Sequence, residues 1–416
     1  METPLEKSEQ VQRLVFLDKI RYSMVLGVVV LHAACAYATI IPWWSVLDSD
    51  RRHIFDLLII VLDVYQMPVL YFVAGYFALS SLQRRGIGGF VSAKLKRLGV
   101  PLLLVGIFFV PIMPYIGYNL RTDQAVGFFA YWWAQMITAA DWHWVHITTP
   151  EIAMRHAQDY SQWHLWFISL LLFLFMLTAV IAKALPQLMQ QRRASEAEGN
   201  TPILTSVVIT GVASAVLMGL VHRVSPDWTW AKIGGFVLAQ PTRIPIYIGF
   251  FILGFYACKR NWFRSPAFPI NPWFWLASAF ILVFLLLGVV KTIGERTAPI
   301  PWDLALMHSG LRVFSALALL CFFLSAGLRW GQRPTATWRH LHPASYDIYL
   351  IHLPIVIIFQ MIALYLPIPV GVKFMLIALL GILVSWSIGR IIIKPYPWFA
   401  AGLLIAGFAA ASLLIN

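Results

Sequence analysis

Apolar segments of about twenty residues alternate with short polar stretches along the whole chain. A helix of that length crosses the hydrocarbon core of a bilayer, which is about 30 Å thick. The segments lie at 22–41, 57–80, 98–118, 163–184, 202–221, 242–258, 272–292, 304–328, 345–366, 371–389 and 397–415. This pattern predicts an all-α fold, a polytopic transmembrane helical bundle of about 10–11 membrane-spanning helices.

The polar stretches between these segments are too short to fold as separate domains. We therefore expect residues 1–416 to form a single integral membrane domain, with 1–20 as a cytoplasmic N-terminal segment and 397–415 as an extra C-terminal span. Residues 119–162 are expected to form an extracytoplasmic loop. Within that loop, 125–140 is short and rich in aromatic residues, which favours an interfacial or re-entrant helix.

The composition agrees with a membrane protein. Hydrophobic residues make up 60% of the chain and charged residues 12%, and the mean hydropathy is +0.75, values that exclude an ordinary soluble domain. The net charge is +13. If the N-terminus is cytoplasmic, most Lys and Arg residues fall in cytoplasmic stretches, as the positive-inside rule requires. The charge therefore indicates membrane orientation and a lipid bilayer partner, and it gives no reason to expect a nucleic acid.

The first predicted span carries ionisable residues on one face. Arg21 and His32 are eleven residues apart, so on a helix they return to within about 20° of each other and lie about 16 Å apart along the axis. Asp18 lies near the same face. Ionisable groups inside a membrane are costly and are functional candidates for that reason. The alternative is an Arg that reaches the membrane surface and a His with a structural role.

The densest group of cations is expected in a loop at 83–97, on the same side of the membrane as Arg21. Arginine binds phosphate through two parallel hydrogen bonds and lysine binds it as a point charge. The loop is therefore a candidate phosphate site, although a role in membrane orientation alone explains it as well. Its cations are Arg84, Arg85, Lys94, Lys96 and Arg97.

Five patterns follow one another in a recognisable order. They are FLDKIR at 16–21 followed by His32, MPVLYFVAGYF at 67–77, FVSAKLKRLGVP at 90–101, HLWFIS at 164–169 and ASYDIYLIHLP at 344–354. Together they resemble the acyltransferase 3 family of integral membrane acyltransferases, over about residues 13–390. The patterns at 67–77 and 344–354 are most similar to the glucans biosynthesis protein C branch, which succinylates periplasmic glucans.

The resemblance implies an enzyme of the bacterial inner membrane with a cytoplasmic N-terminus. Family members transfer an acyl group, usually acetyl, from cytoplasmic acyl-CoA to a hydroxyl of an extracytoplasmic glycan or lipid-linked sugar, whereas the most similar branch suggests succinyl-CoA as donor. His32 is then expected to be catalytic, with Arg21 and Asp18, and the cations at 84–97 to bind acyl-CoA. His32 acts either as a general base or as a nucleophile that forms an acyl-imidazole. No metal is expected.

Several further residues are expected to support this site. An acidic partner for His32 is sought among Asp63, Asp303 and Asp347, and the sequence does not choose between them. Gly75 allows either close helix packing or backbone approach to the acyl chain, and Arg312 is a candidate partner for a succinyl carboxylate. The remaining supporting residues are Tyr71, Trp166, Ser345, Tyr349 and His352, of which the last three share one helix face.

The outer segment 131–166 is rich in aromatic residues, which suits a platform for sugar rings or, equally, an aromatic belt at the membrane surface. Its His143 and His146 have the spacing of a metal pair, but no nearby Cys or acid completes a site. Two other functions remain open. A transporter or flippase of an anionic or glycan substrate predicts movement without acyl turnover, and a non-catalytic scaffold predicts that His32 is dispensable.

Overall fold

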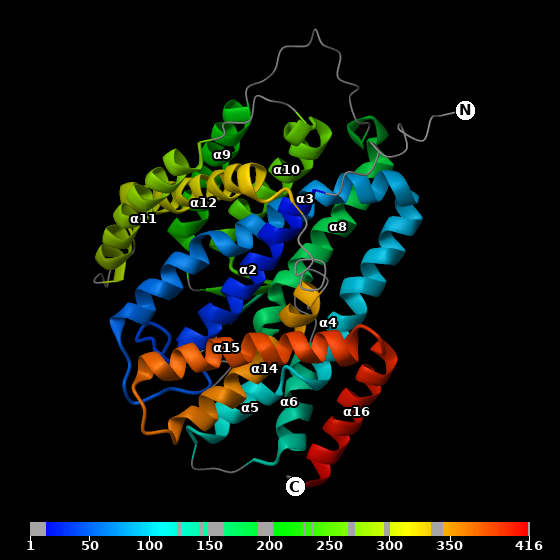
Figure 1. Cartoon of the computed structure of the whole chain (residues 1–416), viewed down its shortest axis with the longest axis vertical. Helices are drawn as coiled ribbons and strands as arrows, with labels where there is room; N and C mark the ends of the chain where they lie inside the picture. The colour runs from blue at the N-terminus through cyan, green and yellow to red at the C-terminus, as the bar shows by residue number, and fades with distance from the viewer. Residues whose placement is uncertain are drawn as a thin grey trace.

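The computed structural model describes residues 14–122, 126–140, 145–148, 162–189, 203–227, 229–233, 237–264, 271–294, 300–333 and 344–414. Within these ranges 84% of the residues are helical, and nine helices are long and apolar enough to cross a membrane. The prediction of an all-α polytopic bundle is therefore confirmed. The helices, in chain order, are α2 (Val15–Ala34), α3 (His53–Lys94), α4 (Val100–Phe108), α5 (Ile112–Asn119), α6 (Phe128–Ala140), α8 (Trp166–Ala184), α9 (Ile203–Val224), α10 (Ile244–Lys259), α11 (Pro272–Gly294), α12 (Trp302–Trp330), α14 (Ser345–Leu364), α15 (Val370–Ile388) and α16 (Pro397–Leu414) (Figure 1).

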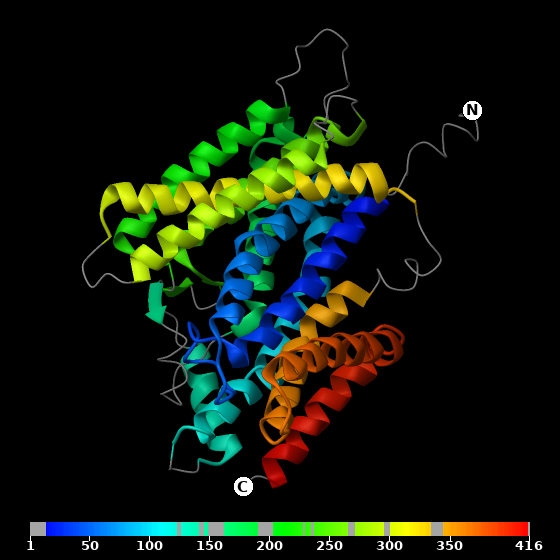
Figure 2. The ribbon, with the colours of Figure 1, turned by 60° about the vertical axis from the view of Figure 1, so that its left-hand side comes forward.

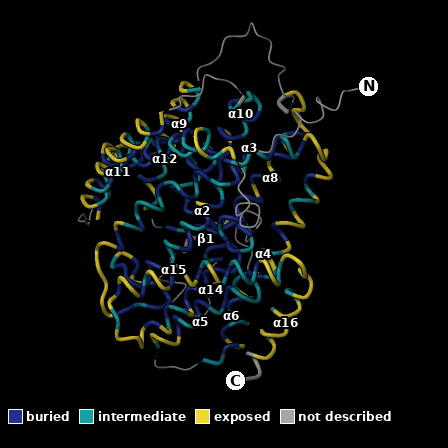
Figure 3. Tube along the Cα trace, viewed as in Figure 1, coloured by how far each residue is buried: buried dark blue, intermediate teal, exposed yellow. Residues whose placement is uncertain are grey.

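Helix α2 lies in the middle of the bundle. It contacts α3, α12, α14 and α15, and in Figures 1 and 2 it runs between α9, α11 and α12 on one side and α14 to α16 on the other. Of the apolar stretch of α2, 61% is buried by protein, against 17% for α11. Figure 3 shows the same contrast between the buried α2 and the exposed α11 and α16. Most of α2 therefore faces protein, whereas α11 presents most of its side chains to lipid.

The predicted cationic loop at 83–97 is helical, so its prediction as a loop was wrong. Helix α3 continues to Lys94 and is interrupted only at Gly86, where φ is 66° and ψ is 173°. Glycine adopts this conformation without the clash that a Cβ would cause. A π-helical turn, Leu95–Gly99, then leads into α4. The two apolar segments predicted at 57–80 and 98–118 thus belong to one nearly continuous helical run, His53–Asn119, which bends back on itself in Figure 1.

Helices α3 and α10 cross with their backbones in contact. A Cβ atom added to Gly75 would lie 2.0 Å from the carbonyl oxygen of Phe251, and one added to Gly254 would lie 2.0 Å from that of Phe72. Each glycine thus makes room for the carbonyl of the facing helix, as small residues do in membrane helix pairs. Of the two roles that the sequence left open for Gly75, the structure supplies helix packing.

A small antiparallel sheet lies outside the helices. Its strands are β1 (Val145–Thr148), β2 (Trp230–Ile233) and β3 (Val237–Ala239), in the order β1-β2-β3. Val145 pairs with Ile233, and Ala231 pairs with Ala239. The sheet joins the predicted outer loop to the segment between α9 and α10. In the same outer loop, the 13-residue α6 forms within the predicted short helix 125–140.

Candidate active site: three histidines between α2, α8 and α14

His32 in the last turn of α2 meets His352 of α14, although the two residues are 320 positions apart in the sequence. His32 Nδ1 and His352 Nε2 are 2.9 Å apart. The other ring nitrogen of His352, Nδ1, lies 2.8 Å from the carbonyl oxygen of Tyr349 and 3.1 Å from that of Ile348. A carbonyl oxygen only accepts hydrogen bonds, so His352 Nδ1 must carry the proton.

This arrangement assigns the tautomers of both rings. With its proton on Nδ1, neutral His352 has a lone pair on Nε2, and His32 Nδ1 must therefore donate to it. The lone pair of His32 then lies on Nε2. Among the described residues, no hydrogen bond engages that atom. His32 is thus arranged to accept a proton, or to attack an electrophile, at Nε2.

The His32 ring contacts two other rings. Trp44 stacks on its face, with centroids 5.6 Å apart and planes 17° apart, whereas His352 meets its edge through the hydrogen bond, with centroids 5.1 Å apart and planes 21° apart. The buried Gln360 links these parts: its Nε2 donates to the His32 carbonyl at 2.9 Å, and its Oε1 accepts from Trp44 Nε1 at 2.9 Å. Arg121 donates to the Trp44 carbonyl. These contacts fix both the ring and the end of α2.

A third histidine, His164, lies at the start of α8 in the short 3₁₀-helix Trp163–Leu165. Its ring centroid is 5.2 Å from that of His352, nearly perpendicular to it. His164 Nε2 donates to the Leu350 carbonyl at 3.0 Å, and the Tyr349 hydroxyl donates to the carbonyl of His164. Sequence reasoning did not select His164 as a site residue. The signals for it were its place in the pattern HLWFIS at 164–169 and its position in the aromatic outer segment 131–166.

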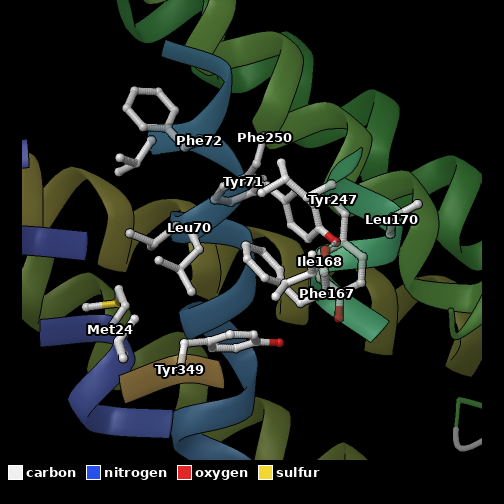
Figure 4. Close-up of a cluster of buried hydrophobic side chains, with 14 of the residues drawn as sticks. Met24, Leu70, Tyr71, Phe72, Phe167, Ile168, Leu170, Tyr247, Phe250 and Tyr349 are labelled. Atoms are coloured by element: carbon white, nitrogen blue, oxygen red, sulfur yellow. Dashed lines mark hydrogen bonds between the residues drawn. The ribbon is translucent and has the colours of Figure 1, made fainter. Parts of the chain in front are cut away.

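Tyr71 and Tyr349 belong to a buried aromatic cluster with Phe167 and Tyr247 (Figure 4). Trp166 contacts this cluster, and the Tyr349 ring lies 5.8 Å from that of His164. Tyr71 lies 4.8 Å from Phe167 and 4.9 Å from Tyr247, measured between ring centroids. Phe167 in turn lies 5.7 Å from Tyr349, and Trp166 lies 5.4 Å from Tyr247. Through Tyr349 this cluster packs against the rings of His164 and His352, and it keeps this part of the bundle apolar. The fifth supporting residue, Ser345, is buried at the start of α14.

No carboxylate contacts His32 in the described part of the chain, so the acidic partner sought at Asp63, Asp303 or Asp347 is not found there. Asp63 instead binds Arg243, at 2.8 Å, and Arg312. The structure supplies His352 as the partner of His32, which the sequence could not indicate because the two residues meet only through folding.

Asp63 belongs to a four-residue ion network with Arg243, Arg312 and Asp227. Asp227 lies 3.1 Å from Arg243 and 3.7 Å from Arg312. Burial alone would raise the pKa of Asp227, but the two guanidinium groups outweigh burial and hold this pKa well below its usual value. Since Arg312 already faces two carboxylates, a succinyl carboxylate would have to compete with them for it.

Arg21 forms an ion pair with Asp18, with Nη2 and Oδ1 3.1 Å apart. The Arg21 side chain keeps 30% of its surface exposed. The two residues lie on the early turns of α2, and Arg21 is about 16 Å along the helix from His32. The exposed part of the Arg21 guanidinium can bind a further anion, while the ion pair with Asp18 holds the guanidinium in place.

The cations at 84–97 lie around the bend at Gly86 in α3 and in the π-helical turn that follows, and all except Lys94 are exposed. The Lys94 ammonium packs over the ring of Phe175, 3.8 Å from its centroid. The Arg97 guanidinium lies 5.7 Å from the ring of Tyr346, whose hydroxyl donates to the Arg97 carbonyl at 2.7 Å. Tyr346 precedes His352 by six residues on α14, about 9 Å along that helix. Among the cations at 84–97, Arg97 therefore contacts α14, the helix that carries His352.

Several aromatic and histidine residues of the outer segment lie outside the described residues, so the predicted sugar platform and the His143–His146 spacing stay untested. They are Trp142, His143, Trp144, His156 and Tyr160, together with the side chain of His146.

A family model described as an acyltransferase domain matches residues 14–390. The chain belongs to the acyltransferase 3 family. It is thus a multi-pass membrane acyltransferase, and this assignment does not favour the transporter alternative. All three histidines and the cations of the α3 bend lie inside the matched range, whereas α16 lies beyond it. No curated protein and no solved structure matches the chain. The likeness to the glucan-succinylating branch therefore stays a prediction.

Proposed function

We propose that this acyltransferase moves an acetyl or succinyl group from cytoplasmic acyl-CoA to a hydroxyl of an extracytoplasmic glycan or lipid-linked sugar, with His32 as general base. The observation that carries the proposal is the hydrogen bond from His32 Nδ1 to His352 Nε2, because it leaves the lone pair of His32 on Nε2.

In the proposed reaction, His32 accepts and then releases one proton while its hydrogen bond to His352 is kept. As the acceptor oxygen attacks the thioester carbonyl carbon, the hydroxyl proton passes to His32 Nε2. When the carbon–sulfur bond breaks, His32 Nε2 gives that proton to the leaving thiolate. The transient imidazolium is stabilised by His352 Nε2, which accepts from Nδ1–H, and by the face of Trp44. The C-terminal end of the α2 dipole adds to this stabilisation.

A nucleophilic route uses the same lone pair. His32 Nε2 would attack the thioester carbon and displace the thiolate as the carbon–sulfur bond breaks. The acceptor oxygen would then attack the acyl carbon, the bond to Nε2 would break, and the hydroxyl proton would pass to the thiolate. The two routes differ in single-turnover experiments without acceptor. The nucleophilic route predicts a rapid burst of one equivalent of thiol per enzyme and an acylated His32. General-base catalysis predicts no burst and no acylated His32, and thiol appears only at the slow rate of hydrolysis by water.

On the donor side, we propose that Arg21, Arg84, Arg85, Lys96 and Arg97 bind the phosphates of acyl-CoA at the cytoplasmic surface. The phosphates cannot enter hydrocarbon, so the nucleotide stays among these cations while the pantetheine arm carries the thioester along α14 toward His32. Lys94 contributes positive charge from its position on Phe175. Donor and acceptor then reach the histidines from opposite sides, and the protein needs no inward-to-outward rocking.

The central experiment compares His32→Ala with the matched variant His53→Ala in proteoliposomes. His53 is a suitable control because it is not a proposed site residue. Its ring is exposed and contacts only Thr39 and Asp56 among the hydrogen bonds and ion pairs described. With labelled acyl-CoA on the cytoplasmic side, we expect acyl transfer to be lost in His32→Ala and retained in His53→Ala, at equal amounts of folded protein. Retained transfer in His32→Ala would refute the role of His32. Movement of a glycan or anion without acyl turnover in the unmodified protein would instead support the transporter.

The proposed orientation, with a cytoplasmic N-terminus in a bacterial inner membrane, is tested by thiol labelling. The native cysteines Cys35, Cys258 and Cys321 are all buried. Gly88→Cys places a thiol on the exposed part of α3 just past the bend at Gly86, where a Cβ meets nothing within 4 Å. Arg51→Cys places one on the exposed loop before α3. A membrane-impermeant reagent should label the first only from the cytoplasm and the second only from outside. Labelling of both from one side would overturn the cross-membrane path.

A further inference from the structure

His164 has a buried hydrogen-bond acceptor that nothing in the described part of the protein uses. Its side chain is only 4% exposed. Because Nε2 donates to the Leu350 carbonyl, the proton lies on Nε2 and the lone pair on Nδ1. Nδ1 is buried and has no hydrogen-bond partner among the described residues. Such an acceptor costs free energy in the folded protein, so its retention calls for a partner that the protein alone does not supply.

The backbone that presents His164 is strained. Trp163 has a φ of 47°, in the left-handed region that bulky residues rarely adopt. This conformation places the Trp163 ring 5.7 Å from that of Trp44, which itself stacks on His32. The Tyr349 hydroxyl holds the carbonyl of His164. Trp163 and His164 thus each contact a residue that itself contacts His32, Trp163 through Trp44 and His164 through His352.

His32 and His164 flank the same ring. Their centroids lie 5.1 Å and 5.2 Å from that of His352. Each contributes one lone pair without a partner, His32 at Nε2 and His164 at Nδ1, and no carboxylate contacts either imidazole in the described ranges. Two neutral acceptors match a ligand with two neutral O–H donors, such as a sugar ring with several hydroxyl groups.

We propose that His164 Nδ1 accepts a hydrogen bond from a second hydroxyl of the acceptor while the reacting hydroxyl binds His32 Nε2. This inference rests on the proposed function and adds a second contact to the acceptor, so the acceptor must present two hydroxyl groups to the site. The acceptor, not the donor, is favoured because His164 lies at the end of α8 remote from the cations. Phe175, which carries the Lys94 ammonium, is eleven residues further along α8, about 16 Å.

Two substitutions test the roles of the two ring nitrogens of His164 separately. In His164→Gln the amide nitrogen takes the place of Nε2 and still donates to the Leu350 carbonyl, but the acceptor at Nδ1 is lost. In His164→Asn the amide oxygen takes the place of Nδ1, and the bond to Leu350 is lost instead. We expect His164→Gln to raise KM for a soluble glucoside at least about tenfold, with KM for acyl-CoA unchanged. His164→Asn should keep a lower glucoside KM than His164→Gln despite a lower melting temperature.

An unchanged glucoside KM in stable His164→Gln would overturn the inference, and so would a raised KM for acyl-CoA alone, which would assign Nδ1 to the pantetheine arm. If the unmodified protein transfers no acyl group from acyl-CoA, the proposed function itself fails.

Monodeoxy glucosides test the inference on the unmodified protein, whether or not the variants fold. One analogue, which keeps the reacting hydroxyl but lacks a second one, should show a raised KM with the unmodified enzyme. That difference should disappear in His164→Gln if this variant folds. Equal KM values for the parent glucoside and all analogues that react would show that no second hydroxyl is bound.

Discussion

His352 orients His32 without being expected to touch the substrate, so its substitution tests the tautomer assignment directly. In His352→Gln the side-chain amide oxygen takes the place of Nε2 and accepts from His32 Nδ1. In His352→Asn the shorter amide occupies the place of Nδ1, near the Tyr349 carbonyl, and does not reach His32. The two variants differ by one methylene, and they should differ in whether His32 keeps its acceptor.

The size of the effect follows from the hydrogen bond that is lost. A buried donor left without an acceptor costs about 1–3 kcal/mol, which corresponds to about a 5- to 150-fold loss. Because this bond fixes the tautomer with the lone pair on Nε2, the loss falls on the rate of transfer. We expect kcat to fall about 10- to 100-fold in His352→Asn and less than about tenfold in His352→Gln. KM for acyl-CoA should be unchanged in both.

The assay is steady-state acyl transfer in proteoliposomes, with the melting temperature of each variant measured in parallel. Equal rates in the two variants would show that the His32–His352 bond does not set the rate, and the tautomer argument would then be wrong. A fall in rate that matches the fall in folded protein would indicate that His352 contributes only to packing.

Three further predictions concern other parts of the molecule. Gly75→Ala should lower the unfolding free energy by about 1–3 kcal/mol, because its Cβ would meet the Phe251 carbonyl, whereas Gly88→Ala, which meets nothing, should be neutral or slightly stabilising. Arg21→Ala and Arg97→Ala should each raise KM for acyl-CoA, with lysine restoring only part of the affinity. The ion network of Asp227 should stabilise the protein at neutral pH and lose this contribution in acid, so Asp227→Asn should be less stable than the unmodified protein at pH 7.

Each of these predictions has a contrary outcome. A normal melting temperature for Gly75→Ala, measured by thermal denaturation, would refute the close crossing of α3 and α10. Unchanged acyl-CoA affinity in both arginine variants would move the donor site elsewhere. The pKa of Asp227 is lowered in the folded protein, so its stabilising contribution is complete above the unfolded value of about 3.9 and declines as the pH falls below it. The stability difference between Asp227→Asn and the unmodified protein should therefore shrink below about pH 4, and a constant difference would contradict the argument.

The sequence alone determined the class of the protein and the positions of its helices. The bilayer sets the length of a spanning helix, and unsatisfied backbone groups are not tolerated in lipid, so apolar length translates directly into helices. All eleven apolar segments overlap helices in the structure. The arrangement of Asp18, Arg21 and His32 on one face also followed from sequence, because they lie on one helix and helical geometry is local. The bend at Gly86 was missed because a glycine-rich polar stretch is as typical of a loop as of a bent helix.

Only the tertiary structure decided which groups surround His32. Spacing along a helix says which residues share a face, but not which helix that face meets. The sequence therefore left three carboxylates open as partners, whereas folding brings in His352, Gln360 and Trp44 and engages Asp63 with arginines. His164 was missed for the same reason. Its tautomer and its unused acceptor depend on the Leu350 carbonyl, which lies 186 residues away and is brought to it by the packing of α8 and α14.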